Sequence, residues 1–563
     1  MKLNNIWGYG QLFGFSAIDG PNRYYNDFIG TLTHKKIGIR FELKEWVKLF
    51  FPVKGRVKFN AITGDMIDAR TQDGDFFITF VDCDTLVGYS PVEPQLIGQK
   101  KLSHKKTWEI DVFFNQFDNF GIRTEKQENG LYKFCIHHSY NYSEARSGVN
   151  YYFDCDIEQL KNKRYDYFKN MPKCRDKKYE MLYYKALSVN KVNVCSPQGR
   201  IDCTWTTPDR VPHRHMWLWD SVFHALAMVN YNQELAKSAI TAVMNQMHEN
   251  GFVPHMMNPT DFSDVTQPQV LAWGIWEVYK KTNDKEFLYK HVEKLEKTFN
   301  WALKNRDKNN NYLLEWLTEP DFLECKCGES GIDNSPRFDF DEDMDAVDFS
   351  CYLAHDILYY TYILRELGRD DRAKEWLSIY NKIKDNVNKL LWDNEDGIYY
   401  DRVINGELTK VITPLSFLPM FAKICDDNQA KKMVATLKRK DLLWTETPLS
   451  TIARTHPTYS TDMWRGGVWL NLNYFVIKGL LNYGFEAEAE ELRLKTLEMV
   501  NKWYKKTGAI FEFFDPEDKC VPYQCDRKGT PTTPPDWRKH VHSIVDFNWS
   551  ACFTLMFIQK DLY

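Results

Sequence analysis

The chain has 563 residues, with 73 Lys and Arg against 77 Asp and Glu, so its formal net charge is −4. This balance excludes the basic surface expected of a nucleic-acid-binding protein, and also a dominant acidic tail. Hydrophobic residues make up 43% of the sequence, enough for a large core, and aromatic residues make up 15%. Because Trp faces suit the apolar faces of sugar rings, carbohydrate is a candidate ligand.

The start of the chain and its cysteines bear on where the protein works. Residues 1–5 lack the apolar segment of a signal peptide. No stretch reaches the roughly 20 apolar residues that span a bilayer. The 13 cysteines are odd in number and irregularly spaced, which argues against a disulfide framework and against a four-Cys zinc site. We therefore expect a cytoplasmic protein with reduced thiols, no membrane association and no metal.

Residues 1–155 are predicted to form an N-terminal β-sandwich domain. Apolar and polar residues alternate in several segments, and turn signals such as Asp73-Gly74 and Asn129-Gly130 separate them. A period of two predicts strands that bury one face, and many short strands joined by turns are typical of a sandwich. The alternating segments are 37–43, 57–61, 108–112 and 132–136.

Residues 156–176 contain a charged stretch, 161–164, and are predicted to be a linker. From 177 to 563 apolar residues recur at i, i+3, i+4 and i+7, as in helices that bury one face. Twelve helices in six hairpins can close into a toroid. We therefore expect a mainly α chain, with an (α/α)6-barrel catalytic domain over 177–563 after the sandwich. The helical segments are 177–190, 219–230, 232–249, 268–282, 285–306, 346–366, 369–391, 414–424, 427–438, 468–482, 484–506 and 546–558.

Long loops in compact domains are commonly functional, and the first one leads to Trp219 and Asp220 at the start of a helix. An indole can stack on a sugar while a carboxylate accepts its hydroxyl hydrogen bonds. The alternative is a core Trp beside a helix-capping Asp. Nearby His213, His215 and His224 lack the spacing of metal ligands and are interpreted as solvated or core histidines.

The second loop holds Asp333 between Gly331 and Pro336. Flanking groups can fix its orientation, so Asp333 is a candidate general acid, and Arg337 is close enough in sequence to share its network. The alternative is an Asx-turn that stabilises the loop. The acidic run over 339–345 lacks the Gly and Glu of an EF-hand and predicts a solvated loop.

The third loop carries Trp464-Arg465-Gly466-Gly467 and then Trp469, just before a helix. The glycines allow close backbone approach to a ligand, and the indoles could wall a pocket. The alternative is a tight turn packed by Trp.

The fourth segment places Glu512 in the apolar run 510–514. A buried carboxylate is costly unless it is hydrogen-bonded or used in chemistry. In a strand, Glu512 and Phe514 would share a face, so the acid would point into an aromatic pocket. The alternative is a paired structural glutamate.

These motifs follow one another in a specific order: Trp219-Asp220-Ser221-x-Phe223-His224, Gln267-Pro268, Gly331–Arg337, Trp464-Arg465-Gly466-x-x-Trp469 and Phe511-Glu512-x-x-Asp515-Pro516. The series resembles glycoside hydrolase family 63 and its bacterial relatives, which include mannosylglycerate and glucosylglycerate hydrolases and α-glucosidases. Family 37 trehalases look like more distant relatives. The resemblance covers roughly residues 175–560, whereas the N-terminal part matches only as a sandwich ahead of the toroid.

The resemblance implies an inverting exo-glycosidase that cleaves an α-glycosidic bond in a small substrate, with no cofactor. Asp333 is similar to the family's general acid and Glu512 to its general base. An α-glucoside is the first expectation and an α-mannoside the second. Gly467 and Phe513-Phe514 depart from the family pattern beside the pocket, which leaves substrate identity more open than mechanism. The positions similar to the sugar-binding wall are Trp219, Asp220, Gln267, Trp273, Arg337, Trp464, Arg465, Gly466 and Trp469.

Inversion requires two carboxylates with unequal tasks. Asp333 must be protonated to give its proton to the leaving oxygen, and Glu512 must be ionised to activate water on the opposite face of the sugar. An inverting pair needs roughly 6.5–9.5 Å between its carboxyl groups to seat that water. We expect desolvation in the aromatic pocket to raise the pKa of Asp333.

Other functions remain open on the same toroid, because fold does not fix function. A sugar epimerase would use paired histidines, for which His213, His215, His224 and His255 are available. A polysaccharide lyase would use a Tyr or His base, and a glycoside phosphorylase would need basic residues in place of Glu512. A non-catalytic carbohydrate-binding protein would keep the Trp residues without needing both carboxylates. The expected partner is a small carbohydrate.

Overall fold

The computed structural model describes residues 1–4, 6–7, 11–24, 30–33, 38–43, 47–98, 103–107, 109–115, 117–319, 321, 325–339, 342–404, 406–528 and 542–561. Contacts between Cα atoms divide the chain into two compact units. The first comprises Met1–Gln198, Asp209–Arg214 and Tyr504–Ala509. The second comprises Gly199–Pro208, His215–Trp503 and Ile510–Tyr563.

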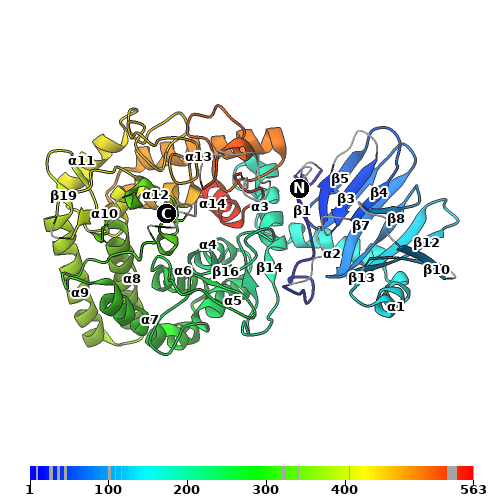
Figure 1. Ribbon diagram of the computed structural model, residues 1–563, viewed down its shortest axis with the longest axis horizontal. Helices are drawn as coiled ribbons and strands as arrows, with labels where there is room; N and C mark the ends of the chain where they lie inside the picture. Colours follow the sequence, from blue (N-terminus) through cyan, green and yellow to red (C-terminus); the bar gives the residue numbers. More distant parts are fainter. Residues whose placement is uncertain are drawn as a thin grey trace. The chain divides into compact units, whose positions relative to one another are not determined.

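The first unit contains two antiparallel sheets, which confirms the predicted sheet-rich N-terminal region (Figure 1). The smaller sheet has the strand order β1-β2-β3-β4-β9, and the larger has the order β10-β11-β12-β13-β8-β7-β6-β5. The strands are β1 (Leu12–Phe13), β2 (Gly30–Thr33), β3 (Ile39–Leu43), β4 (Val47–Phe51), β5 (Lys58–Ile62), β6 (Met66–Arg70), β7 (Asp75–Asp82), β8 (Thr85–Ser90), β9 (Gln95–Gly98), β10 (Ser103–Thr107), β11 (Ile110–Phe114), β12 (Asn119–Lys126) and β13 (Tyr132–Ser139). Of the residues predicted as strands, Ile37 and Trp108 lie outside the described residues.

Aromatic side chains join the two sheets. The ring centroid of Phe51 on β4 lies 4.9 Å from that of Phe76 on β7 and 5.2 Å from that of Phe134 on β13. All three side chains are fully buried, so the sheets pack face to face around them. Helix α1 (Tyr142–Phe153) covers the opposite face of the larger sheet. Gly121 permits this approach, because a Cβ there would lie 2.2 Å from the carbonyl oxygen of Ala145.

The segment 156–176, expected to be a linker, holds helix α2 (Ile157–Lys169). Arg164 of this helix is buried and forms ion pairs with Asp19 at 2.7 Å and Asp65 at 3.3 Å. Lys191 on helix α3 (Glu180–Val192) pairs with the same two carboxylates. This shared network explains why the first unit extends to Gln198, beyond the boundary expected at residue 177.

The second unit is built from helices, as predicted, and the helix bounds agree with the apolar periodicity to within a few residues. The segment 414–424 differs, since it divides into a 3-10 turn (Pro414–Phe417) and a single α-helical turn. Pro414 and Pro419 lack the N–H groups that a longer helix would use. The helices are α4 (Leu218–Met228), α5 (Gln233–Met244), α6 (Leu271–Thr282), α7 (Lys285–Arg306), α8 (Val347–Glu366), α9 (Asp370–Leu390), α10 (Leu418–Phe421), α11 (Asp427–Leu437), α12 (Leu470–Asn482), α13 (Glu486–Thr507) and α14 (Asn548–Gln559).

The even-numbered helices of this unit contact one another in a closed order. Contacts join α4 to α6, α6 to α8, α8 to α10, α10 to α12, α12 to α14 and α14 back to α4. Figure 1 shows α5, α7, α9 and α11 outside this ring. The segments that carry the predicted site residues lead into the N-terminal ends of α4, α6, α8, α12 and α14.

None of the helices within the described residues has a stretch whose length and hydropathy would let it span a bilayer.

Candidate active site

Asp333 lies in the loop that precedes α8, and a buried glutamate anchors this loop. Glu329 accepts hydrogen bonds from Arg306 at 2.8 and 2.9 Å, from the backbone N–H of Leu317 at 2.8 Å and from that of Thr266 at 3.3 Å. Its side chain is fully buried. These bonds tie the Asp333 loop to the end of α7 and to the segment before α6, so the position of Asp333 is fixed from several elements.

Trp219 packs directly against the Asp333 loop. Gly331 has φ +72°, and a Cβ at this position would lie 2.5 Å from the indole of Trp219, so only glycine fits there. The side chain of Gln267 accepts a hydrogen bond from the backbone N–H of Trp219 at 3.1 Å. Asp220 follows in the first turn of α4 and is buried. Three of the predicted sugar-binding residues therefore lie together beside the Asp333 loop.

Lys528 forms an ion pair with Asp333 that the sequence did not predict. Its Nζ atom lies 2.5 Å from Oδ2, and the two side chains are 30% and 19% exposed. Burial acts to raise the pKa of Asp333, but the charges of Lys528 and then Arg527 outweigh it and hold the pKa below its ordinary value. The expectation that the pocket raises the pKa of Asp333 is therefore wrong, because the neighbouring cations stabilise the carboxylate.

Two other groups share the surroundings of Asp333. Burial lowers the pKa of His255 to about 4, although Asp333 opposes this shift. Burial, followed by the charge of Asp333, raises the pKa of the Cys325 thiol to about 12. Both side chains are therefore neutral near pH 7, and Lys528 and Arg527 carry the positive charge beside the acid.

Glu512 lies in an extended segment ahead of α14. Its backbone N–H donates to the carbonyl of Ile544 at 2.9 Å, and the N–H of Ile544 lies 3.3 Å from Oε2. The residue is 2% exposed, and its carboxylate accepts a hydrogen bond from the guanidinium of Arg527. The predicted alternative of a paired glutamate is therefore part of the observed geometry, and it does not exclude a catalytic role.

The two candidate catalytic carboxylates are thus contacted by two consecutive cations. Arg527 pairs with Glu512, while Lys528 pairs with Asp333. Adjacent residues lie close together, and Arg527 also lowers the pKa of Asp333. Asp333 and Glu512, which are 179 positions apart in the sequence, therefore belong to one charged cluster.

An aromatic wall borders this cluster. The indoles of Trp464 and Trp469 stack with centroids 3.7 Å apart, and Trp469 stacks on Phe513 at 5.0 Å. Trp549 lies 5.5 Å from both Trp469 and Trp219, which connects the loop before α12 with the start of α4. The wall consists of side chains from three of the four predicted site segments, together with Trp549 of α14.

The loop before α12 is bound to the Asp333 loop. The side chain of Asn334 accepts from the backbone N–H of Trp464 at 3.2 Å, and Arg465 pairs with Asp339 at 2.6 and 2.9 Å. Gly466 has φ +153°, and a Cβ there would lie 1.9 Å from the carbonyl oxygen of Ser460. The glycine thus permits a tight turn within the loop before α12.

Two of the predicted residues have other surroundings. Arg337 was expected to share a network with Asp333, yet its guanidinium bonds to Asp348 at 2.6 and 2.7 Å and to Asp401 at 2.6 and 2.8 Å. These buried contacts fix the start of α8. Trp273 lies inside the helical ring, where it packs on aromatic residues of α10 and α12.

The site contains four residues that were not predicted as members of it, Arg527, Lys528, Cys325 and Trp549. His255 was predicted only as a possible epimerase residue. The dipeptide Arg527-Lys528 follows the Glu512 motif in the same connection to α14. A search for cations near two predicted carboxylates would have raised these residues as candidates, although nothing in their spacing identifies their partners.

Two carboxylates beside stacked indoles, at one end of a ring of helices, are typical of glycoside hydrolases. Residues 213–550 match the family described as the mannosylglycerate hydrolase MGH1-like glycoside hydrolase domain. The chain belongs to this family, because the match covers more than half of the sequence.

Curated relatives are distant in sequence. An uncharacterised protein of Borreliella burgdorferi is 25% identical over 47% of this chain and 54% of its own length. The mannosylglycerate hydrolase of Rubrobacter radiotolerans is 23% identical over 56% of this chain and 90% of its own length. The chain thus spans about half of the first relative and most of the second.

Solved structures support the fold. A GH63 mannosylglycerate hydrolase from Thermus thermophilus has a TM-score of 0.54 at 22% identity, over 66% of this chain and 99% of that one. A bacterial glucoamylase has a TM-score of 0.62 at 11% identity, over 99% of this chain and 95% of that one. At these identities the likeness concerns the fold alone.

Proposed function

We propose that the protein is an inverting, exo-acting glycoside hydrolase that cleaves an α-glycosidic bond in a small glycoside. An α-glucoside is the first candidate substrate and an α-mannoside the second. The main observation behind the proposal is that Asp333 and Glu512 belong to one charged cluster beside the stacked indoles of Trp464 and Trp469. Family membership and the closed order of inner helices support an (α/α)6 toroid as the scaffold.

In this mechanism Asp333 is the general acid and Glu512 the general base. Asp333 gives its proton to the glycosidic oxygen as the bond to the anomeric carbon breaks. Glu512 takes a proton from a water molecule that attacks the anomeric carbon from the opposite face, so the configuration inverts. Trp219, Asp220, Gln267, Trp464, Arg465, Gly466 and Trp469 form or support the sugar site. Arg337 supports it through ion pairs with Asp348 and Asp401, and Trp273 supports it through aromatic packing.

The ion pair of Lys528 with Asp333 bears on the substrate. A general acid must carry a proton, and a contacting ammonium opposes protonation. An anionic leaving group would attract Lys528 and leave Asp333 free to become protonated. This favours an acidic aglycone, of the kind in the mannosylglycerate for which several relatives are named.

Proton NMR of the full-length protein with a substrate panel tests the proposal. The panel contains trehalose, kojibiose, nigerose, maltose, isomaltose, glucosylglycerate and mannosylglycerate, and the first anomeric signal to appear is recorded. We expect a β-anomer from an α-glycoside. Removing an acid or base contribution lowers rates by about 10²–10⁴-fold. We expect this loss in Asp333→Asn and in Glu512→Gln.

The exposed Glu375→Gln serves as the matched control, because that side chain is 60% exposed on α9. A first-formed α-anomer would mean retention and would refute both assigned roles. Epimerised or unsaturated sugar products would favour the epimerase or lyase alternatives. Binding without turnover in the unmodified protein would favour a carbohydrate-binding protein.

A further inference from the structure

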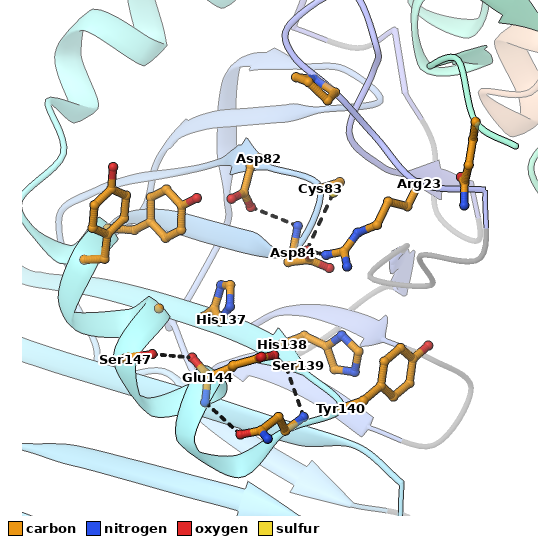
Figure 2. A pocket seen from close by; sticks show the side chains of 16 residues that line it. Arg23, Asp82, Cys83, Asp84, His137, His138, Ser139, Tyr140, Glu144 and Ser147 are labelled. Carbon is orange, nitrogen blue, oxygen red and sulfur yellow. Dashed lines mark hydrogen bonds and ion pairs between the residues drawn. The ribbon is translucent and has the colours of Figure 1, made fainter. Parts of the chain in front are cut away.

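The first unit contains a cavity of about 1140 Å³ that the glycosidase proposal does not use (Figure 2). It is bounded by the β7–β8 turn, the end of β13 and helix α1, and Arg23 and Gln198 also line it. Figure 2 shows Asp82 and Asp84 on one side and His137 and Glu144 on the other. The volume is somewhat larger than the range that small-molecule pockets usually occupy, about 300–1,000 Å³.

The polar groups of this cavity are held in place by the fold. Asp82 accepts from the backbone N–H of Asp84 at 2.9 Å and interacts with the hydroxyl of Tyr152, whose pKa is raised by burial and by this carboxylate. Glu144 accepts from Ser139 at 2.7 Å. Each carboxylate uses few of its roughly four acceptor positions in these bonds, so acceptors remain for a ligand with several hydroxyl groups.

The charge of the cavity argues against an anionic ligand. Asp82, Asp84 and Glu144 face one arginine, Arg23, which pairs with Asp84. Burial lowers the pKa of His137, so its imidazole adds no positive charge near pH 7. A phosphate or carboxylate would meet net repulsion, whereas a neutral polyol would not.

Aromatic side chains also line this cavity. Tyr151 on α1 is 79% exposed and Tyr140 is 61% exposed, and both line the cavity. Tyr151 also packs edge-on against Tyr152, with centroids 4.8 Å apart, which restricts its ring. A restricted, exposed ring beside carboxylates offers an apolar face and hydroxyl acceptors, the two features that a sugar ring requires.

We propose that this cavity binds a short neutral saccharide, as a site separate from the Asp333–Glu512 cluster. Tyr151 supplies the stacking face, and Asp82 and Glu144 accept hydroxyl hydrogen bonds. The site would hold a carbohydrate on the N-terminal unit without acting on it.

Isothermal titration calorimetry tests this with the full-length Glu512→Gln protein, which suppresses turnover. The probes are maltotetraose, cellotetraose and mannotetraose. Loss of a charge-assisted hydrogen bond or a stacking contact weakens binding by about tenfold. We expect that loss for at least one tetrasaccharide in Tyr151→Ala and in Asp82→Asn. Asp82→Asn keeps the acceptor for the Asp84 N–H, and alanine suits an exposed helix position, so both variants should fold.

The control variant is Tyr289→Ala, a 49% exposed tyrosine on α7, which should leave the affinity unchanged. Tetrasaccharide affinities that Tyr151→Ala and Asp82→Asn leave unaltered would overturn the proposal, as would equal losses in Tyr289→Ala. Binding of choline in place of the sugars would also overturn it and would assign the cavity to an organic cation. Hydrolysis measured in the Tyr151→Ala protein with Glu512 intact separates this site from the proposed function, because that rate should not change.

Discussion

Replacing Lys528 with methionine should move the pH dependence of hydrolysis toward alkaline pH. Nζ and Oδ2 lie 2.5 Å apart, so the gross attraction is about 2–7 kcal/mol for effective dielectric constants of about 80 to 20. An opposite charge at contact shifts a carboxyl pKa by about 1–3 units. Because Lys528 is 30% exposed, solvent screening favours the lower half of that range, about 1–2 units.

The sign follows from the role of Asp333. Its pKa is lowered by Lys528 and Arg527, so the protonated acid is scarce at neutral pH, and removing one cation raises the protonated fraction. The alkaline limb of kcat/KM, which reports the acid in the free enzyme, should therefore rise by about 1–2 pH units in Lys528→Met. Lys528→Arg keeps the charge and should leave this limb in place.

The assay is kcat/KM from pH 4 to pH 9 on the best substrate of the panel. An unmoved alkaline limb in Lys528→Met would refute the electrostatic reasoning. Equal shifts in the methionine and arginine variants would also refute it, since they would indicate a change of shape and not of charge.

Three further predictions concern the residues that support the site. Arg337→Met leaves two buried carboxylates unpaired and should lower the free energy of unfolding by about 3–5 kcal/mol in urea titrations, while Arg372→Met at a 44% exposed pair should cost at most about 1 kcal/mol. Gly331→Ala places a Cβ 2.5 Å from an indole at φ +72°, so it should lower both stability and kcat/KM. Gly368→Ala, with φ +73° and open space around its Cβ, should show only the backbone cost of about 1–2 kcal/mol. Cys325, with a pKa near 12 from burial and its aspartate neighbour, should react with iodoacetamide at pH 8 more slowly than a free thiol, as measured by mass spectrometry; rapid labelling would contradict its described environment.

The helices were predictable because their apolar periodicity is local. The segment 285–306 coincides with α7, whose start is marked by Asp284, a side chain that caps the backbone N–H of Phe287. Segment 156–176 was expected to be a linker because of its charged residues 161–164, and the structure shows that it holds helix α2. One of them, Arg164, is buried and pairs with Asp19 and Asp65, which lie more than 90 positions away in the sequence. No local pattern in the sequence predicts these ion pairs.

The candidate site was predictable in part for the same reason. Asp333 and Glu512 stand out because a turn and an apolar run each isolate a carboxylate. The direction of the Asp333 pKa was missed because only burial could be inferred from neighbouring residues. The decisive charge belongs to Lys528, 195 positions further along the chain, and tertiary structure alone brings it there.

The ring of inner helices closes at the contact between α14 and α4, here called the seam. The place of this seam in the sequence bears on biosynthesis. The facing residues are more than 300 positions apart, so closing the seam carries the entropic cost of a very long loop. During translation α4 leaves the ribosome long before α14 has been made. Until then the apolar face of α4 is exposed unless something shields it. Glu512 is made 179 residues after Asp333, so the pair of carboxylates can assemble only once this later part of the chain has been synthesised.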